Sequence, residues 1–218
     1  MTGGYGGRCE LLSIGRILNS SQRKKQITEL KAQANSERIL LFGDAAEVSL
    51  VPTITRCWTR IGKQRVILTP GVRASKWWNW GAVDPVTGRT VHIVHRRRNN
   101  VGFRRLLAAI SRAYDLPTHP QRHVILFVDN DKAHSAKAVR QLLEKHDQIQ
   151  IEWLPSYSPE LNAQEDVWQH MRRRVTHNHY FQHTHALLEA VQQFHQELED
   201  NPRTVLRLLA KWAKLTSG

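Results

Sequence analysis

Two short apolar runs, each followed by an aspartate, form the clearest pattern along the chain. Residues 39–43, Ile-Leu-Leu-Phe-Gly, precede Asp44, and residues 124–128, Val-Ile-Leu-Phe-Val, precede Asp129. Runs of this length without polar interruption are typical of strands that helices bury on both faces. If the two strands are parallel neighbours, their carboxyl ends bring Asp44 and Asp129 to the same edge of the sheet.

The remaining apolar and polar positions predict further strands and helices around these two runs. Strand composition marks residues 65–68, 76–83, 90–94 and 149–154, and the turn sequence DPVTG at residues 84–88 joins two of them as a hairpin. Helix formers and helical periodicity mark residues 17–35, 101–114, 135–146, 161–176, 183–199 and 202–214. This order predicts an α/β fold, a mixed sheet with helices on both faces.

A third acidic residue, Glu165, follows Asp129 with 35 residues between them. Ser158 and Pro159 form a helix-initiation signal. In the helix that follows, Glu165 lies three residues before Trp168 and so shares the predicted buried side. A carboxylate there is costly unless it is paired or binds a metal. The alternative is an ordinary first-turn glutamate, which the helix dipole favours.

The charge balance predicts a polyanionic partner. The 218 residues include 32 Lys and Arg against 19 Asp and Glu, a formal net charge of +13. A merely basic or ribosome-associated protein is the alternative, but arginines recur in runs, which favours nucleic acid. The residues predicted to contact DNA are Arg96, Arg97, Arg98, Arg172, Arg173 and Arg174.

Several other classes of protein are disfavoured by the sequence. Cys9 and Cys57 are the two cysteines of the chain, far apart and outside any metal-ligand spacing, so neither a disulfide framework nor a zinc knuckle is predicted. No apolar stretch approaches the ~20 residues that span a bilayer. The sequence MTGGYGGRCE lacks the apolar core of a signal peptide, so an intracellular compartment and no membrane partner are expected.

Two aromatic clusters leave alternatives open. Trp77, Trp78 and Trp80 could stack on nucleic-acid bases, but in a strand Trp78 and Trp80 share one face, so packing in the core is favoured. The histidines between residues 177 and 185 could suggest zinc. Their irregular spacing and the lack of a cysteine partner favour a solvated helix start or contact with DNA phosphates.

Three segments together carry a family resemblance. LFGDAAEV, ILFVDNDKAH and LPSYSPELNAQEDVW resemble the three catalytic blocks of bacterial insertion-sequence transposases of the mariner-like DDE group. The likeness extends over residues 26–191. It implies the fold that this group shares with retroviral integrases, a ribonuclease H-like mixed five-stranded sheet with helices on both faces. It also implies a DDE transposase that performs divalent-metal-dependent DNA strand cleavage and 3′-end strand transfer.

Position by position, the resemblance assigns the catalytic residues. Asp44, Asp129 and Glu165 would be the ligands of Mg²⁺ or Mn²⁺, with two ions expected. Supporting positions in the same blocks are Asn130, His134 and Asn162.

The resemblance further suggests how the chain is organised. Residues 1–35 would form a flexible start and lead-in helix, residues 36–200 the ribonuclease H-like DDE catalytic domain, and residues 201–218 a C-terminal helix. Such transposases normally carry N-terminal helix-turn-helix modules, for which residues 1–35 leave room for one or two helices only. Three alternatives are open: modules encoded in a separate reading frame, a truncated copy, or a stand-alone relative. The expected partners are double-stranded DNA and a second copy of the chain in a homodimer, in the cytoplasm of a bacterium and associated with its nucleoid.

Two rival functions remain open at this stage. A truncated, catalytically weak transposase would act as a non-specific DNA-binding or inhibitory protein. A structure-specific nuclease of the same fold would cleave DNA without joining ends. Metal-dependent nicking separates the first rival from an enzyme, and transfer of a 3′ end separates a transposase from the second.

Overall fold

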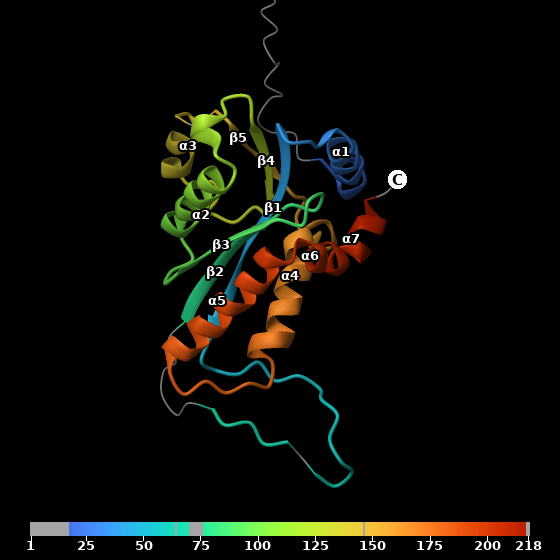
Figure 1. Cartoon of the computed structure of the whole chain (residues 1–218), viewed down its shortest axis with the longest axis vertical. Helices are drawn as coiled ribbons and strands as arrows, with labels where there is room; N and C mark the ends of the chain where they lie inside the picture. The colour runs from blue at the N-terminus through green and yellow to red at the C-terminus, as the bar shows by residue number, and fades with distance from the viewer. Residues whose placement is uncertain (1–17, 64, 70–75, 146, 217–218) are drawn as a thin grey trace, which may run out of the picture.

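A five-stranded mixed sheet forms the centre of the computed structural model, which describes residues 18–63, 65–69, 76–145 and 147–216. Its order is β3-β2-β1-β4-β5 (Figure 1). The strands are β1 (Arg38–Ser49), β2 (Lys76–Val83), β3 (Thr90–His95), β4 (His123–Val128) and β5 (Ile149–Trp153). β1 and β4 are parallel, as are β4 and β5, whereas β1–β2 and β2–β3 are antiparallel. The predicted α/β class and mixed sheet are confirmed.

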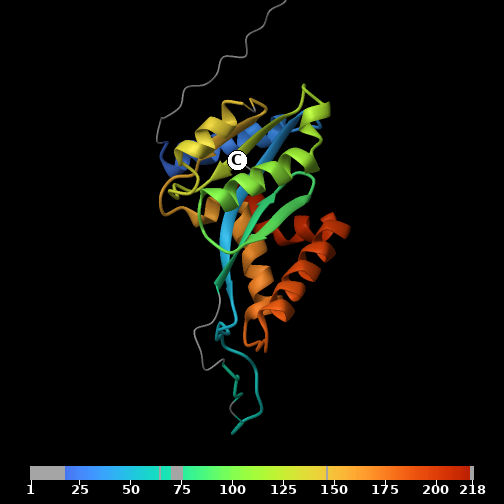
Figure 2. The same cartoon turned by 90° about the vertical axis from the view of Figure 1, so that its left-hand side faces the viewer.

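Helices cover both faces of this sheet (Figure 2). The α-helices are α1 (Ser20–Gln33), α2 (Asn100–Ala113), α3 (Lys137–Leu143), α4 (Ala163–Met171), α5 (Thr184–Asp200), α6 (Pro202–Leu208) and α7 (Ala210–Leu215). Two 3₁₀ turns, η1 (Leu116–Thr118) and η2 (Pro159–Leu161), and one π-helical segment, η3 (Arg172–Thr176), complete the elements.

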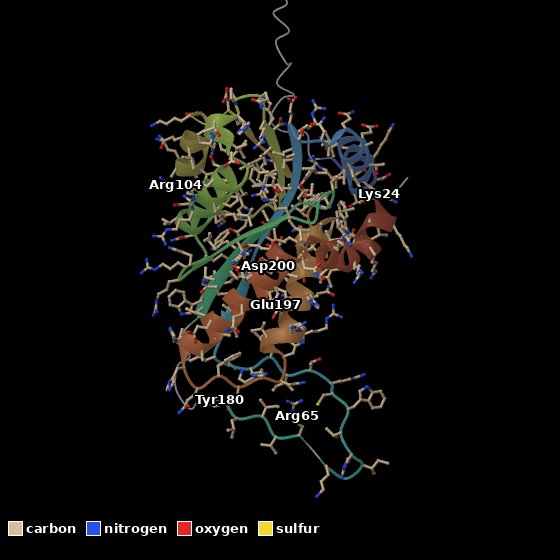
Figure 3. All side chains as sticks on the ribbon, viewed as in Figure 1. Lys24, Arg65, Arg104, Tyr180, Glu197 and Asp200 are labelled. Atoms are coloured by element: carbon tan, nitrogen blue, oxygen red, sulfur yellow. The ribbon has the colours of Figure 1, made fainter. Side chains whose placement is uncertain are left out.

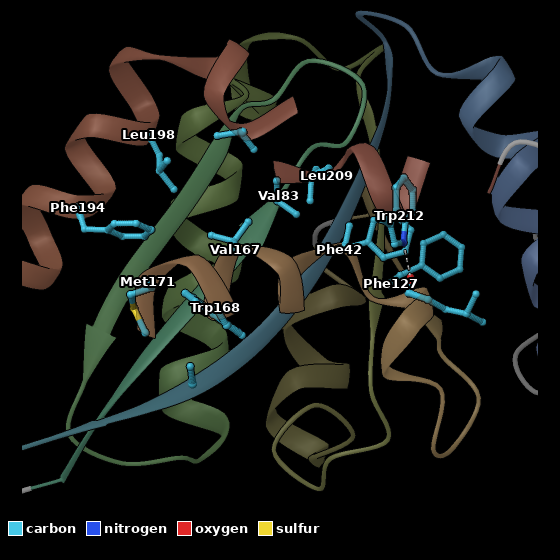
Figure 4. Close-up of a cluster of buried hydrophobic side chains, with 14 of the residues drawn as sticks. Phe42, Val83, Phe127, Val167, Trp168, Met171, Phe194, Leu198, Leu209 and Trp212 are labelled. Carbon is cyan, nitrogen blue, oxygen red and sulfur yellow. Dashed lines mark hydrogen bonds between the residues drawn. The ribbon is translucent and has the colours of Figure 1, made fainter. Parts of the chain in front are cut away.

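The alternation of side chains along β1 divides the core into two clusters. Leu40 and Phe42 belong to a cluster shared with α1, α4, α5, α6 and α7 (Figure 4). Ile39 and Leu41 belong to a second cluster shared with α2 and α3. Successive strand residues point to opposite faces, so a strand covered on both sides must be apolar at every position. This accounts for the continuous apolar run that begins β1.

Three predicted elements differ from the structure. The first apolar strand continues past Asp44 to Ser49, because β2 pairs with this second half in antiparallel register. Residues 65–68 form no strand; Val66 and Leu68 are exposed there and have no strand partner. The helix predicted for residues 161–176 is divided into the end of η2, then α4, then η3.

Of the flexible start and lead-in helix predicted for residues 1–35, residues 1–17, which include Cys9, lie outside the described residues. The lead-in helix is α1, which begins at Ser20 after the capping residue Asn19. Within the described ranges, no helix is long and apolar enough to cross a membrane.

Candidate active site

The register of β1 and β4 places the two aspartates at equivalent positions on neighbouring strands. The last parallel pair joins Phe42 to Phe127, whose rings stack with centroids 5.1 Å apart. Asp44 and Asp129 each lie two residues further along. Because side chains alternate between faces, both aspartates belong to the face of Phe42 and Phe127, the face that α4 covers. The predicted meeting of the two carboxylates at one edge is therefore explained by the pairing of the strands, although Asp44 lies within β1 and not at its end.

Glu165 reaches the same face from the first turn of α4. Asn162 caps this helix, since its side-chain oxygen accepts a hydrogen bond of 3.1 Å from the Gln164 N–H. The amide of Asn162 also lies 3.5 Å from the carbonyl oxygen of Gly43, the residue before Asp44. Asn162 thus attaches the start of α4 to β1 beside the aspartates.

One sequence prediction about Glu165 was wrong in detail. Trp168 and Met171 are buried, as predicted, but the Glu165 side chain is 31 % exposed and does not share their side. Glu165 lies in the first turn of α4, at the margin of the buried stripe, and its carboxylate is turned outward to Arg172. Glu165 faces the cleft instead of the core.

Gly81 allows α4 to pack in close contact with the sheet. Gly81 pairs with Asp44 across β1 and β2. A Cβ atom at position 81 would lie 2.6 Å from Cη2 of Trp168 and 2.9 Å from Nε2 of Gln164. Contacts this short do not occur, so a larger residue would push α4, and Glu165 with it, away from the aspartates.

The three carboxylates line one cleft of about 450 Å³. One wall is the segment between β5 and α4, and Asn130 and Asp131 lie beside Asp129. The lining residues are Asp44, Asp129, Asn130, Asp131, Leu154, Pro155, Ser156, Tyr157, Ser158, Pro159, Asn162 and Glu165. The structure therefore brings the three predicted catalytic residues, Asn130 and Asn162 into a single site.

His134 orients the carboxylate of Asp129 by a hydrogen bond. Its Nδ1 lies 2.9 Å from the Asp129 carboxylate and 3.0 Å from the Asp129 carbonyl oxygen, and since both are acceptors, Nδ1 carries the proton. The imidazole is buried against Phe103 and the edge of Trp80. Burial raises the pKa of Asp129, but the hydrogen bond and charge of His134 and nearby groups outweigh it, so the pKa lies below its ordinary value.

Asp44 has the opposite electrostatic character. Burial raises the pKa of its carboxyl to about 6, and the negative charges of Asp129 and Glu165 add to this effect. A backbone N–H bond from Ala45 and the charge of Arg98 oppose it. Burial is the largest of these causes, and a cation in the cleft would offset both the burial and the repulsion by favouring the ionised carboxylate.

Two arginines contact the carboxylates directly. Arg172 places Nη2 2.5 Å from Glu165 Oε1, two helical turns along the same face. Arg98 places Nη2 3.0 Å from Asp131 and 3.7 Å from Asp129. Asp131 was not among the predicted site residues, although its position two residues after Asp129 could have indicated it.

The present side-chain positions do not form a metal cage. In the described part of the chain, no three His, Cys, Asp or Glu side chains are close enough to hold one ion together. Glu165 points to Arg172, and Asp129 points to His134 and Arg98. Side-chain rotation would have to bring the carboxylates onto a shared cation.

The predicted DNA-contacting arginines differ in exposure, and two of them, Arg98 and Arg172, contact acids of the cleft. Arg96, Arg97 and Arg98 are exposed in the bend after β3. In η3, Arg172 is half-buried at Glu165, whereas Arg173 and Arg174 are exposed and Arg174 pairs with Glu197 on α5 at 3.1 Å. π-helical segments such as η3 are frequent at functional sites.

The tryptophans of β2 are mainly structural. Trp80 is fully buried, and Trp77 and Trp78 are half-buried against opposite faces of the sheet. Arg96 lies over the Trp77 ring at 5.5 Å, and Arg98 lies over Trp78 at 5.2 Å. The preference for packing over base stacking is confirmed for Trp80.

Comparison with curated proteins gives two relatives. The chain is 25 % identical over 189 residues to an uncharacterized 39 kDa protein of insertion element IS630 from Shigella sonnei, covering 86 % of this chain and 54 % of the relative. It is 30 % identical over 135 residues to the uncharacterized protein y4pE/y4sA of Sinorhizobium fredii (strain NBRC 101917 / NGR234), covering 62 % and 94 %. The chain thus spans about half the length of the insertion-element relative.

Solved structures with the same fold include those of Mos1 transposase. A pre-cleavage Mos1 transpososome matches with a TM-score of 0.63 at 18 % identity, covering 96 % of this chain and 67 % of that one. The catalytic domain of Mos1 mariner transposase matches with a TM-score of 0.57 at 18 % identity, covering 94 % and 97 %. These likenesses confirm the ribonuclease H-like fold that the resemblance implied.

A match to a family model establishes the family of the chain. The model for DDE superfamily endonucleases matches residues 39–188, which contain all three carboxylates and most of the chain. The resemblance to DDE transposases and the prediction of an enzyme of this class are confirmed at the level of the family. The chain belongs to the DDE superfamily endonucleases.

Proposed function

We propose that this chain is the catalytic domain of a DNA transposase, which cleaves a DNA strand and transfers the resulting 3′ end in the presence of a divalent metal. The observation that carries the proposal is the meeting of Asp44, Asp129 and Glu165 in one cleft, from three elements that are distant in sequence. Family membership supports the reaction class.

The chemistry of these side chains fits Mg²⁺ or Mn²⁺. Both prefer oxygen ligands, and the cleft offers three carboxylates; burial, with smaller contributions from the charges of Asp129 and Glu165, raises the pKa of Asp44 to about 6. A structure of the Mos1 mariner paired-end complex contains Mn, and another contains Mg. Two bound cations would activate a water or 3′-hydroxyl and neutralise the leaving oxygen of an in-line displacement.

The protein's own residues have distinct tasks in this proposal. Asp44 and Asp129 supply oxygens from the rigid sheet, and Glu165 supplies a third from a helix whose position Asn162 and Gly81 set. His134 keeps Asp129 ionised and aimed into the cleft. Because Arg172 and Arg98 share the carboxylates' oxygens, we expect them to release these oxygens when cations bind and to turn toward DNA phosphates.

DNA binding by this domain would be largely independent of sequence. The exposed arginines on two sides of the cleft offer charges for backbone phosphates, and phosphate contacts position a duplex without reading its bases. Structures of Mos1 transposase include a paired-end complex with the left transposon end. For this chain, a homodimer on DNA and separately encoded recognition modules are part of the proposal.

A nicking assay tests the proposal. Supercoiled DNA should be nicked with Mg²⁺ or Mn²⁺ and left intact with EDTA, and Ca²⁺ should support binding without cleavage because it accepts looser geometry. Transfer of a labelled 3′ end into a second DNA would distinguish a transposase from a nuclease. Full activity in EDTA would contradict a metal-dependent mechanism, and binding without any nicking would favour an inhibitory protein.

A further inference from the structure

Tyr157 is the most unusual residue at the rim of the carboxylate cleft. Its side chain is fully exposed, with a relative exposure of 101 %, and yet it lines the same cleft as Asp44, Asp129 and Glu165. Its backbone has a φ of +58°, the left-handed region. On either side the chain is well anchored, since Leu154 is buried and Ser158 Oγ lies 2.8 Å from Ser20 Oγ.

These observations show that Tyr157 does not serve the stability of the fold. The left-handed region is unfavourable for a bulky residue, and glycine or asparagine would adopt it at lower cost. A fully exposed ring contributes no packing energy that would compensate. Residues held in such conformations cluster at functional sites, where the surrounding structure imposes them.

The position of the ring defines what it can contact. The neighbouring carboxylates are the groups proposed to act on the scissile phosphodiester, so a nucleotide next to that bond lies beside the Tyr157 wall of the cleft. In a duplex the faces of the bases are covered by their stacked neighbours. A base that is unpaired or turned out of the stack exposes its face and can stack on an aromatic side chain.

We propose that Tyr157 is a stacking platform for an unpaired base adjacent to the scissile phosphodiester. This inference rests on the proposed function, because it takes the carboxylates as the reacting site. It adds a substrate preference: the chain favours DNA whose reacting end is unpaired over the same DNA fully paired. The strained backbone keeps the ring out of the core and available to a base.

The test measures binding without cleavage. Two duplexes of equal length, one with a matched and one with a mismatched terminal pair, carry 2-aminopurine as the last 3′ nucleotide. Affinity and quenching of 2-aminopurine fluorescence are measured in Ca²⁺ for the unsubstituted chain, for Tyr157→Phe and for Tyr157→Leu. Tyr180→Leu is the control, because Tyr180 is an exposed tyrosine that does not line the cleft (Figure 3).

The expected preference for the mismatched duplex is about tenfold, the size of one base–aromatic stack. Tyr157→Phe and Tyr180→Leu should keep both the preference and the quenching, and Tyr157→Leu should abolish both. Tyr157→Gly should also abolish them while raising thermal stability, since it removes the backbone strain. Equal binding of the two duplexes by the unsubstituted chain, or an unchanged preference in Tyr157→Leu, would overturn the inference. The proposed function would still stand if metal-dependent nicking were present, and it would fail separately if nicking were absent.

Discussion

Two polar clusters lie on the same face of the sheet, and they differ in charge and in access to solvent. The carboxylate cleft is open to solvent, charged and balanced by arginines at its rim. The second cluster, His92, His195 and Asn79, is closed beneath α5. The rings of His92 and His195 stack with centroids 3.7 Å apart.

The closed cluster has an acidic neighbour at its margin, and its interior contacts join imidazole and amide groups. Nε2 of His195 lies 2.6 Å from Nδ2 of Asn79, and Glu199 Oε1 lies 3.1 Å from Nδ1 of His92 at the partly exposed margin. Burial lowers the pKa of His92 to about 4. Burial and the neighbouring His92 lower the pKa of His195 well below its ordinary value. Both imidazoles are therefore neutral at pH 7.

The difference follows from where each cluster lies along the strands. The cleft begins two residues beyond the last pair of β1 and β4, where β1 continues without β4 beside it. The histidines lie where α5 packs directly on β2 and β3. We infer that charge is retained where the sheet has a free edge and is suppressed where a helix seals it. The following variants test this distinction.

The largest expected effect is that of Asp129→Asn on catalysis. The variant keeps the volume of the side chain but removes the charge needed to hold a cation, so metal-dependent nicking should fall below detection. Thermal stability and DNA affinity should change little. Nicking near the normal rate at the same metal concentration would show that Asp129 is not a ligand.

The closed cluster should instead control stability against acid. A histidine protonates near pH 6.5 in the unfolded chain but stays neutral in the folded one, so the unfolded state binds more protons as the pH falls. Stability contributed by neutral His92 and His195 is present above pH 6.5 and is lost toward pH 4.5. For His92 the loss should be about 2 kcal/mol over this range, and His195 should add a loss of the same sign.

Denaturant unfolding at several pH values measures this loss. His195→Gln preserves a partner for Asn79 and cannot protonate, so it should remove about half of the pH dependence. His185→Gln is the control, because His185 is exposed, with 84 % of its side chain accessible, and should leave the pH profile unchanged. An unaltered profile for His195→Gln would mean that the cluster does not titrate as proposed.

Gly81→Ala should affect the cleft and the packing of α4 together. The added methyl would overlap Trp168 and Gln164, and overpacking of this kind costs about 1–3 kcal/mol. Nicking should decrease in addition, since Glu165 moves with α4. Ala82→Gly, a small-residue change at the next position on the opposite face, serves as the comparison: it should lower stability without a specific loss of nicking. Normal activity in Gly81→Ala would separate the position of α4 from catalysis.

The smallest effect should come from the arginines of η3. Replacing Arg172, Arg173 and Arg174 together with alanine should flatten the slope of log affinity against log salt by about two units if Arg173 and Arg174 contact phosphates and Arg172 remains with Glu165. Three units would indicate that Arg172 also turns to DNA, because each neutralised phosphate contributes about −0.9. A salt titration on two unrelated duplexes measures the slope. An unchanged slope would place the DNA elsewhere.

Local sequence was sufficient to predict the elements that bury apolar faces. The runs before Asp44 and Asp129 predicted parallel neighbouring strands because continuous burial leaves a continuous apolar signature. The second half of β1 was missed because Ala45, Ala46 and Glu47 carry no such signature; it is a strand because β2 pairs with it. Residues 65–68 show the converse, strand composition without a partner.

The chemistry of the site was predictable in type but not in arrangement. Three acids in family-like blocks predicted the carboxylate cluster. The contacts of Arg98 and Arg172 could not be predicted, because they depend on how the bend after β3 and the segment η3 approach the sheet. The histidine pair was not recognised at all, since His92 and His195 are far apart in sequence and each resembles an ordinary polar residue.

The contacts of Trp212 in the core determine when the cleft can form during synthesis of the chain. The Trp212 side chain on α7 packs on Phe42, two residues before Asp44, and its Nε1 donates a 2.9 Å hydrogen bond to the Leu161 carbonyl just before α4. Because α7 follows α4 along the chain, these contacts of the start of α4 can form only after α7 has been synthesised. A nascent chain carries both aspartates long before Glu165 is set in place, so the strand-cleaving site would be assembled only after translation of α7.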